Sequence, residues 1–416
     1  MARGGAQEQA AKIPFRDVFA VAEFRALWLA QLLSVVGDQL ARVALTVLVY
    51  DRTRSALLAA VTFVASVVPI FIGGLTLAWL ADQYARRRVM IACDLVRAAL
   101  VLIMAIPGIP LAALVALLFV VTLVGAPFSS ARAAIYPDVL SGDSYVMGTA
   151  VTLTTYQFAQ VLGFAAGGTA VGFFGIRTSL ILDAATFVAS ALIVQAWVRP
   201  RPAPSAAVGG RREASRLTDL VAGARLVFGR PALRTPMLFG WLATFYVAPE
   251  GVAAPLAHDF GGGAVAVGVI LAADALGQTV GAIAFSRFVA PSTRLRFMGP
   301  LAVAACGVLA LFFWRPGFAL SLLILCASGL FACYQLAANA AFVTAAPPER
   351  RSQAFGLAQG GLYLGQGTVM ILAGAAAQHY APARVIAVCG AVGTVVALAM
   401  AIGSARESRL PTNERR

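Results

Sequence analysis

The chain has 416 residues, of which 60% are hydrophobic and 12% charged, and its mean hydropathy is +0.84. A water-soluble domain has too little interior to cover that much apolar surface, so the composition predicts an all-α integral membrane protein. The net charge of +14 comes from arginines in short tracts between apolar runs, which is the pattern of loops that lie on anionic lipid and argues against nucleic acid as a partner. Lys12 is the only lysine, so the sequence has no Gly-Lys-Ser/Thr phosphate loop, which an ATP-driven pump would need.

Twelve apolar runs are long enough to cross a bilayer, which takes about 20 mostly apolar residues. We expect spans at about 24–50, 55–81, 88–107, 110–134, 145–174, 177–198, 234–259, 263–289, 294–314, 317–345, 352–378 and 382–404. They predict twelve transmembrane helices in two pseudo-symmetric six-helix halves. The predicted units are a cytoplasmic segment 1–23, halves 24–198 and 234–404, a linker 199–233 and a cytoplasmic tail 405–416.

The first run contains Asp38 and Arg42, although an ionisable group at the centre of a span costs about 2.5 to 3.5 kcal/mol on insertion scales. Four residues apart, the two side chains share a helix face, so we expect an ion pair. One interpretation is a structural pair that holds two spans together. The other is a proton or substrate site, with Asp38 as a proton-coupling residue.

The second run ends in LADQYARRRVM, and the third continues with an acid and a base one turn apart. Such a group can form an inner gate that breaks and reforms during a conformational change. The alternative is that the arginines only obey the positive-inside rule. The predicted gate residues are Asp82, Arg86, Arg87, Arg88, Asp94 and Arg97.

The linker from Arg199 is rich in Pro, Gly and Arg, and divides the chain in the middle. Within it, SRLTDLVAGARLVF places apolar residues on one helical face, so we expect an amphipathic helix lying on the membrane surface.

Two further acids interrupt spans of the second half. Glu250 lies between Pro249 and Gly251, which free backbone groups in the seventh span, and Asp274 lies about ten residues into the eighth, near mid-bilayer. Neither has an arginine nearby in sequence, and burial favours the neutral form of a carboxyl group. Both are therefore candidates to carry protons, whereas Asp183, nearer the end of its span, is interpreted as structural.

Polar and aromatic side chains within apolar spans are candidates for a substrate cavity, because ligand sites are mostly apolar with a few placed polar groups. Interhelical hydrogen bonding is the alternative role for each. The candidates are Tyr156, Gln157, Gln160, Gln278, Tyr334, Gln335, Asn339, Gln359, Tyr363 and Gln366.

The two halves resemble one another. The stretch 73–90 aligns with 281–298, and VVGDQL around Asp38 aligns with VAPEGV around Glu250. Such duplication is typical of transporters that bind substrate near the midplane between two halves. Most arginines fall on one side if both termini are cytoplasmic, which the positive-inside rule favours.

The stretch after the second span resembles the loop motif of the major facilitator superfamily, Gly-x-x-x-Asp-Arg-x-Gly-Arg-Arg. Asp82 matches the acid of the motif and Arg86, Arg87 and Arg88 its basic end, while Ala78, Gln83 and Ala85 depart from it. With twelve spans and two halves, the resemblance covers the whole chain and is closest to the macrolide-efflux and enterobactin-exporter branch of drug:proton antiporters. In that superfamily the motif acid is thought to steady the outward-open state at the amino end of the eleventh helix, here near Ser352 and Gln353.

The resemblance implies a secondary transporter of the bacterial plasma membrane that exports a small amphiphilic or apolar compound (drug, natural product or siderophore) by proton antiport and alternating access, and it links the chain to drug resistance. The expected partners are the substrate, protons and membrane lipid, with a monomeric chain and no enzymatic activity. A lipid-like (lysophospholipid) carrier and a non-transporting sensor or scaffold are the alternatives. The five cysteines and two histidines lack metal-ligand spacing, so no metal or other cofactor is expected.

Overall fold

The computed structural model describes residues 15–203, 223–347 and 350–409. Most of the predicted amphipathic helix falls in 204–222, outside the described residues. The first half contains the helices α1 (Phe15–Ala20), α2 (Ala22–Thr53), α3 (Ala56–Ala65), α4 (Val68–Thr76), α5 (Leu80–Gln83), α6 (Arg86–Met104), α7 (Leu111–Val139) and α8 (Gly142–Trp197). The second half contains α10 (Pro231–Trp241), α11 (Ala243–Tyr246), α12 (Ala248–Gly251), α13 (Ala253–Asp259), α14 (Ala264–Phe288), α15 (Arg294–Gly307), the 3-10 helix η2 (Val308–Trp314), α16 (Phe318–Phe331), α17 (Tyr334–Ala345), α18 (Arg351–Ala376) and α19 (Pro382–Arg409).

The number of spans agrees with the twelve expected from the sequence. Among the described residues, eight helical segments are long and apolar enough to cross a membrane, and the bent segment α10–α13 makes a ninth. α8 comprises two spans, because its 56 residues reverse direction at Gly175, whose φ of 79° suits glycine. The more polar α6 and α18 supply the remaining two.

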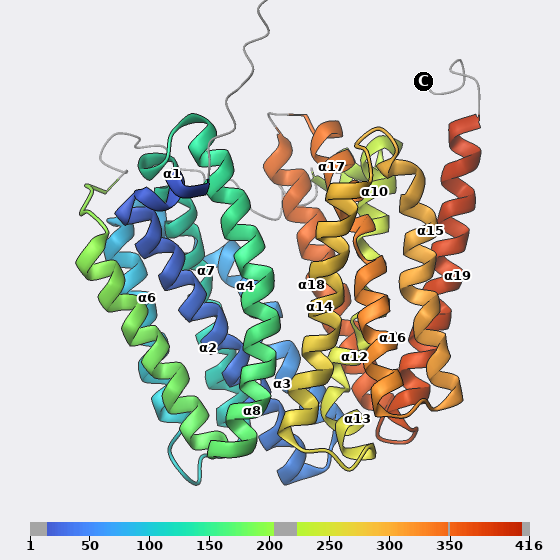
Figure 1. Cartoon of the computed structure of the whole chain (residues 1–416), viewed down its shortest axis with the longest axis horizontal. Helices are drawn as coiled ribbons and strands as arrows, with labels where there is room; N and C mark the ends of the chain where they lie inside the picture. Colours follow the sequence, from blue (N-terminus) through green and yellow to red (C-terminus); the bar gives the residue numbers. More distant parts are fainter. Residues whose placement is uncertain (1–14, 204–222, 348–349, 410–416) are drawn as a thin grey trace, which may run out of the picture.

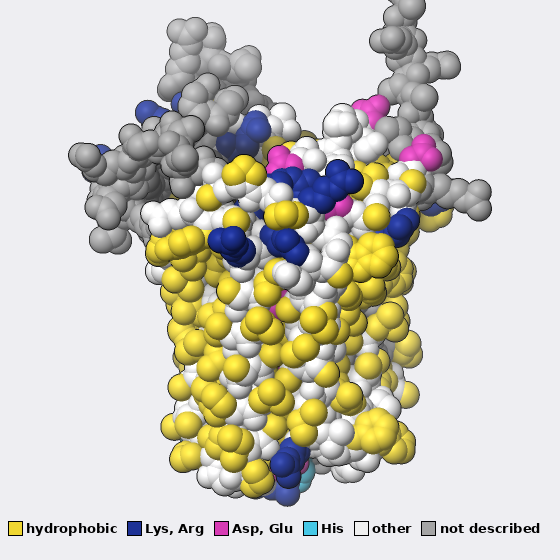
Figure 2. Space-filling model, turned by 90° about the vertical axis from the view of Figure 1, so that its left-hand side faces the viewer, with side chains coloured by type: hydrophobic (Ala, Val, Ile, Leu, Met, Phe, Trp, Pro, Cys, Tyr) yellow, Lys and Arg dark blue, Asp and Glu magenta, His cyan; other side chains and the backbone are white. Residues whose placement is uncertain are grey.

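The helices form two bundles that lie side by side, α1 to α8 in one and α10 to α19 in the other (Figure 1). α1 and the carboxyl end of α19 lie on the same face, as the even number of spans requires. Figure 2 shows an apolar belt around the side of the molecule, with Lys and Arg side chains gathered mainly at the end that carries the termini. This is the surface expected of a protein embedded in lipid.

Two spans are broken where the sequence disfavours a continuous helix. α3 ends at Ala65 and α4 begins at Val68, one residue before Pro69, which cannot donate a backbone hydrogen bond. The seventh span bends by 45° between Gly251 and Ala253, close to the break expected from Pro249 and Gly251. Both breaks free backbone groups inside a span.

The bundles meet most closely toward the face opposite the termini. There, a Cβ on Gly168 of α8 would lie 2.8 Å from the Cα of Gly268 on α14. Farther out, the Gln378 side chain donates to the Ser55 hydroxyl at 2.7 Å, and the rings of Tyr50 and His258 lie 5.8 Å apart. These contacts join the two halves and close that face.

Candidate functional site

Two neighbouring cavities lie inside the helical bundle. One, of about 310 Å³, lies within the first half between α2, α6, α7 and α8. The other, of about 300 Å³, lies between the two halves. Arg42, Ser66, Ile70 and Tyr156 line both, so the cavities are adjacent parts of one polar region.

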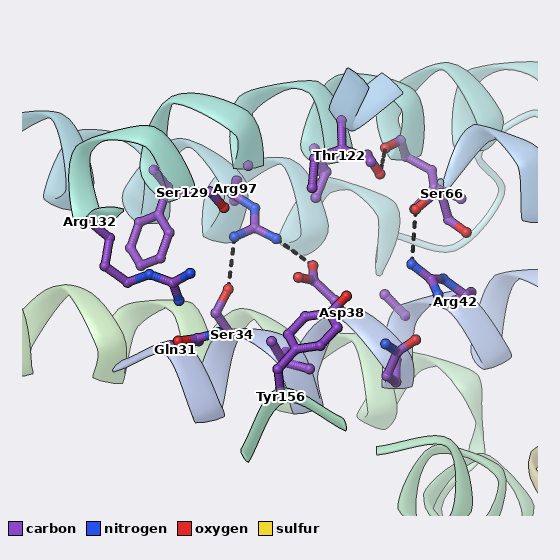
Figure 3. A pocket seen from close by; sticks show the side chains of 18 of the residues that line it. Gln31, Ser34, Asp38, Arg42, Ser66, Arg97, Thr122, Ser129, Arg132 and Tyr156 are labelled. Atoms are coloured by element: carbon purple, nitrogen blue, oxygen red, sulfur yellow. Dashed lines mark hydrogen bonds and ion pairs between the residues drawn. The ribbon is translucent and has the colours of Figure 1, made fainter. Parts of the chain in front are cut away.

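The first cavity is organised by Arg97 of α6 (Figure 3). Its guanidinium donates to the carboxylate of Asp38 on α2 and, through Nη1, to Ser34 Oγ at 3.0 Å. Arg97 is only 3% exposed, whereas the Asp38 side chain is 35% exposed toward the cavity. The ring of Phe187 covers the guanidinium at 4.0 Å, a cation–π distance. Asp38 is therefore the accessible end of a largely buried ion pair.

The structure corrects the ion pair expected between Asp38 and Arg42. Arg42 Nη2 donates instead to the backbone carbonyl of Ser66 at 3.0 Å, and its guanidinium lies 5.4 Å from the centre of the Phe63 ring. The physical reason is that the break between α3 and α4 leaves the Ser66 carbonyl outside the helical ladder, while the cation for Asp38 arrives from another helix. Spacing along one helix contains no information on either partner.

The structure also corrects the placement of Asp94 and Arg97 at the inner gate. Eight residues of helix separate Asp94 from Arg86, about 12 Å at 1.5 Å per residue, which carries both side chains into the bundle. Asp94 is fully buried and accepts a hydrogen bond from Ser190 of α8 at 2.6 Å. Arg97 and Asp94 thus belong to the interior of the first half.

The remaining gate candidates stay at the end of the molecule that carries the termini. Arg86 donates to Asp138 at 2.9 Å and to the Ala134 carbonyl at 2.7 Å, both on α7, and Arg87 donates to the Gln195 carbonyl of α8. Asp82 and Arg88 are exposed, and Asp82 is in no ion pair with a described residue. The arginines tie helices together within one half, and the contact of Asp82 with α18 stays a prediction.

The cavity between the halves contains both acids singled out in the second half. Glu250 lies on α12 and Asp274 on α14, and Arg42 lines the same cavity from the first half. Gln278 donates to Asp274 Oδ2 at 2.7 Å, and Gln335 donates to the Tyr246 hydroxyl. Glu250 interacts electrostatically with Asp274 and Arg42. Within the described residues neither acid is in an ion pair, so each is accessible to a proton or a cationic group.

Six of the ten polar and aromatic residues expected at a substrate cavity line this one. They are Tyr156, Gln160, Gln278, Gln335, Tyr363 and Gln366. Tyr363 also stacks on Phe71 of the other half at 6.1 Å. The polar wall of the cavity therefore comes from α8, α14, α17 and α18.

The other four residues lie elsewhere. Tyr334 is fully buried, and its hydroxyl donates to the Phe239 carbonyl at 3.0 Å, so it belongs to the core. Asn339 and Gln359 line an adjacent cavity of about 300 Å³ between α10, α17 and α18, which shares Gln335 and Leu362 with the cavity between the halves. Gln157 is not among the residues that line these cavities, since its neighbour Tyr156 takes the inward position.

Sequence reasoning missed several polar residues of the first cavity, among them Gln31, Ser34, Ser66, Thr122 and Arg132. Ser66 had a readable signal, because Pro69 follows it and predicts a helix break. Ser34 lies four residues before Asp38 and so shares its helix face, which was a second usable signal.

This architecture, two helical bundles around a polar cavity with broken spans, is that of a secondary transporter. Residues 27–249 and 250–416 match the Major Facilitator Superfamily, and the chain belongs to this family. It is therefore a multi-pass membrane transporter and not an enzyme.

Among known proteins, the chain is similar to the enterobactin exporter EntS of Shigella boydii serotype 4 (strain Sb227), with 26% identity over 269 residues, 62% of this chain and 62% of the exporter. It is also similar to the uncharacterized MFS-type transporter YkuC of Bacillus subtilis (strain 168), with 24% identity over 243 residues, 56% of this chain and 55% of YkuC. The match thus spans less than two thirds of either relative.

Solved structures show the same fold at low sequence identity. A bacterial homologue of the human lysosomal transporter Spinster, in an inward-facing and occupied conformation, matches with a TM-score of 0.71 and 14% identity over 96% of this chain and 99% of that chain. A POT family transporter in complex with 5-aminolevulinic acid matches with a TM-score of 0.72 and 12% identity over 92% of this chain and 96% of that chain.

Proposed function

We propose that this transporter exports a small amphiphilic or largely apolar organic compound in exchange for protons. The observation that carries the proposal is the cavity between the halves, where Glu250 and Asp274 of the second half share one space with Arg42 of the first. Acids inside a membrane protein are costly and mark proton or substrate pathways. The similarity to an enterobactin exporter supports export of an organic compound.

The closed face supports alternating access between two sides of the membrane. Ser55 with Gln378, and Tyr50 with His258, join the halves on the face opposite the termini. With both termini in the cytoplasm, as the basic residues at that end favour, this conformation faces inward (Figure 2). An exporter loads its substrate from the cytoplasm in this state.

Glu250 and Asp274 are the proposed coupling acids, with Asp38 as the third. Because no cation holds Glu250 or Asp274 in an ion pair within the described chain, a proton and a cationic or hydrogen-bonding substrate compete for the same oxygens. Competition of this kind couples release of one ligand to uptake of the other. Tyr363, Gln366 and Gln160 supply the hydrogen-bonding wall beside the two acids.

Transport by the purified protein in lipid vesicles tests this function, with enterobactin and the lipophilic fluorescent cation ethidium as probes. An imposed pH gradient should drive accumulation of at least one probe. Glu250→Gln or Asp274→Asn should abolish that accumulation and spare probe exchange at equal pH, since exchange needs no net proton movement. Asp143→Asn, an exposed acid on α8, is the matched control and should behave as wild type. If both variants keep full gradient-driven transport, coupling lies elsewhere, with Asp38 next, or the carrier is a uniporter.

A lipid-like substrate is the second candidate, supported by an apolar cavity of about 540 Å³ between α18 and α19. Its lining includes Phe313, Val388 and Val392, all exposed on the surface of the bundle, and Arg384, a cation suited to a phosphate group. A lysophospholipid added to the same vesicles distinguishes the two substrate classes, because only a lipid carrier moves it. A non-transporting sensor or scaffold predicts movement of no probe.

A further inference from the structure

Two carboxyl groups form ion pairs with the guanidinium of Arg97, and a third lies near enough to interact with it electrostatically. Asp38 comes from α2, Asp94 from α6 and Asp183 from the second span of α8. Asp94 and Asp183 are 0% exposed. Of the side chains that are buried in this region, Asp94 and Asp183 are acidic and Arg97 is basic.

The three carboxyl groups are satisfied to very different extents. Asp38 accepts from Arg97 and faces the cavity. Asp94 accepts from Ser190 at 2.6 Å through Oδ2, while its Oδ1 lies 3.8 Å from Arg97 Nη1. Neither oxygen of Asp183 has a hydrogen-bond partner of normal geometry among the described residues. The two enclosed acids are therefore less well balanced than Asp38, which faces the cavity.

The polar group next to the Asp183 carboxyl oxygens is the hydroxyl of Thr186. A Cβ on Gly37 of α2 would lie 2.3 Å from both Asp183 Oδ1 and Thr186 Oγ1, so the two oxygens are close neighbours. The Thr186 hydroxyl, however, donates its hydrogen to the Asp183 backbone carbonyl at 2.7 Å. Only lone pairs of Thr186 remain toward the carboxyl group, and these favour a carboxyl that carries its own hydrogen.

One guanidinium balances one carboxylate, and it is already bonded to Asp38. A second or third ionised carboxyl in the same dry region would be an unpaired buried charge, which proteins avoid by protonation. Protonation makes such a buried carboxyl group neutral and removes the unpaired charge.

We propose that Asp183 and Asp94 form a second proton-binding site of the transporter, which exchanges protons with the cavity through the Arg97–Asp38 pair. The exchange is balanced: the proton leaves Asp183 and is taken up by Asp38, while the guanidinium leaves Asp38 and pairs with the new Asp183 carboxylate. Net charge in the cluster is unchanged, and the proton has moved from an enclosed acid to one that faces the cavity. As a step in coupling, this rests on the proton-driven transport proposed above.

The helices α2, α6 and α8 supply the charged and titratable groups that face this site. Asp183 interacts with Asp38 and Arg97, and Asp94 interacts with the same two residues. Cys93 precedes Asp94 on α6 and is buried beside it. From α7, Gly125 lies against the guanidinium, where an added Cβ would be 3.7 Å from Arg97 Cζ. The Phe187 ring covers the guanidinium, so pairing with Arg97 governs the protonation of the site.

Infrared spectroscopy of the purified protein at neutral pH tests the proposal without any transport assay, because a protonated carboxyl has a carbonyl stretch that a carboxylate lacks. The background is Glu250→Gln/Asp274→Asn, which removes the two acids of the cavity between the halves. In that background we expect a remaining protonated-carboxyl band that loses part of its area with Asp183→Asn and more with the added Asp94→Asn. The control Asp143→Asn should leave the band unchanged. A band that neither Asp183→Asn nor Asp94→Asn reduces would overturn the proposal.

Gly37→Ala provides a test that keeps the carboxyl group, should Asp183→Asn fail to fold. Its new Cβ would press on Asp183 Oδ1, so the protonated-carboxyl band should shift in frequency. An unshifted band would count against Asp183 as its source.

The two proposals can also fail separately. If the protonated-carboxyl band depends on Asp183 but the vesicles show no gradient-driven transport, the proton site stands and the proposed function is overturned. If the vesicles show gradient-driven transport but the band depends on neither Asp183 nor Asp94, the proposed function stands and the proton site is overturned.

Discussion

Arg97 on α6 and Asp38 on α2 form the ion pair at the centre of the first half, although 59 residues separate them in the chain. The same guanidinium also bonds Ser34, which lies one helical turn before Asp38 on α2. Arg97 therefore joins α6 to α2 through two side chains, whereas Arg42 donates to the Ser66 carbonyl at the break between α3 and α4.

The first prediction concerns this pair. Arg97→Gln should destabilise the protein by about 3 to 5 kcal/mol, because it breaks a largely buried ion pair and leaves Asp38 without the guanidinium to which it is bonded. Asp38→Asn should cost less, since Arg97 keeps Asp94 as a neighbour. Thermal unfolding of the detergent-purified variants measures both, and equal losses would contradict the asymmetry.

The same measurement separates Asp38 from Arg42. The two residues have different partners, so Asp38→Asn and Arg42→Gln should each destabilise the protein, and the double variant should be less stable than either single variant. A double variant that is more stable than either single variant would instead restore the direct pair expected from the spacing.

The second prediction is that a short cross-link can lock the closed face. Ser55 and Gln378 come from different halves, and the end of the long Gln378 side chain reaches the Ser55 hydroxyl at 2.7 Å, so a bifunctional thiol reagent with a reducible spacer should bridge the two positions in Ser55→Cys/Gln378→Cys. The cross-linked protein should stop transporting and recover after the spacer is reduced, because alternating access requires this contact to break. Each single cysteine variant is the control. Full transport by fully cross-linked protein would show that the halves need not separate there.

The third prediction compares Gly168, which is tightly packed, with Gly74, which has open space around it. Gly168→Ala would place a Cβ 2.7 Å from the Ala264 carbonyl oxygen of α14, an overpacking that typically costs about 1 to 3 kcal/mol. It should loosen the closed face and raise the labelling rate of a Ser55→Cys reporter by an impermeant thiol reagent. Gly74→Ala, which meets nothing within 4 Å, should leave that rate unchanged. Equal labelling in both would argue that α8 and α14 do not set the closed face.

The fourth prediction concerns Asp82, an exposed acid with no ion pair to a described residue in this conformation. Asp82→Asn should lower turnover and leave the thermal stability of this conformation unchanged, since the acid acts in another state. Arg86→Gln should lower stability modestly, because Arg86 bonds both Asp138 and the Ala134 carbonyl here. Normal turnover by a well-expressed Asp82→Asn variant would remove Asp82 from the gate.

The span count and the helix breaks could be predicted from the sequence because hydropathy and proline act locally. The bend beside Pro249 and Gly251 is where their chemistry requires it. Gln160, Gln278 and Gln366 line the cavity between the halves because polar side chains in an apolar span gain most by facing polar space.

Side-chain partners could not be predicted in the same way, because they depend on how helices far apart in sequence pack. Asp38 has a suitable cation four residues away, yet it bonds one from α6. Tyr334 has the same residue type as Tyr363, but rotation of α17 turns it into the core, where its hydroxyl bonds the Phe239 carbonyl. The rotation of a helix about its axis is a tertiary property.

The reversal at Gly175 has a practical consequence for anyone who wishes to trap this transporter. One residue there joins two spans, and only Arg54 and Ser55 separate α2 from α3. The face opposite the termini thus consists largely of helix ends and offers few protruding loops. An antibody fragment or nanobody raised against that face must recognise a low surface formed by both bundles together, so it should distinguish the closed arrangement from the open one.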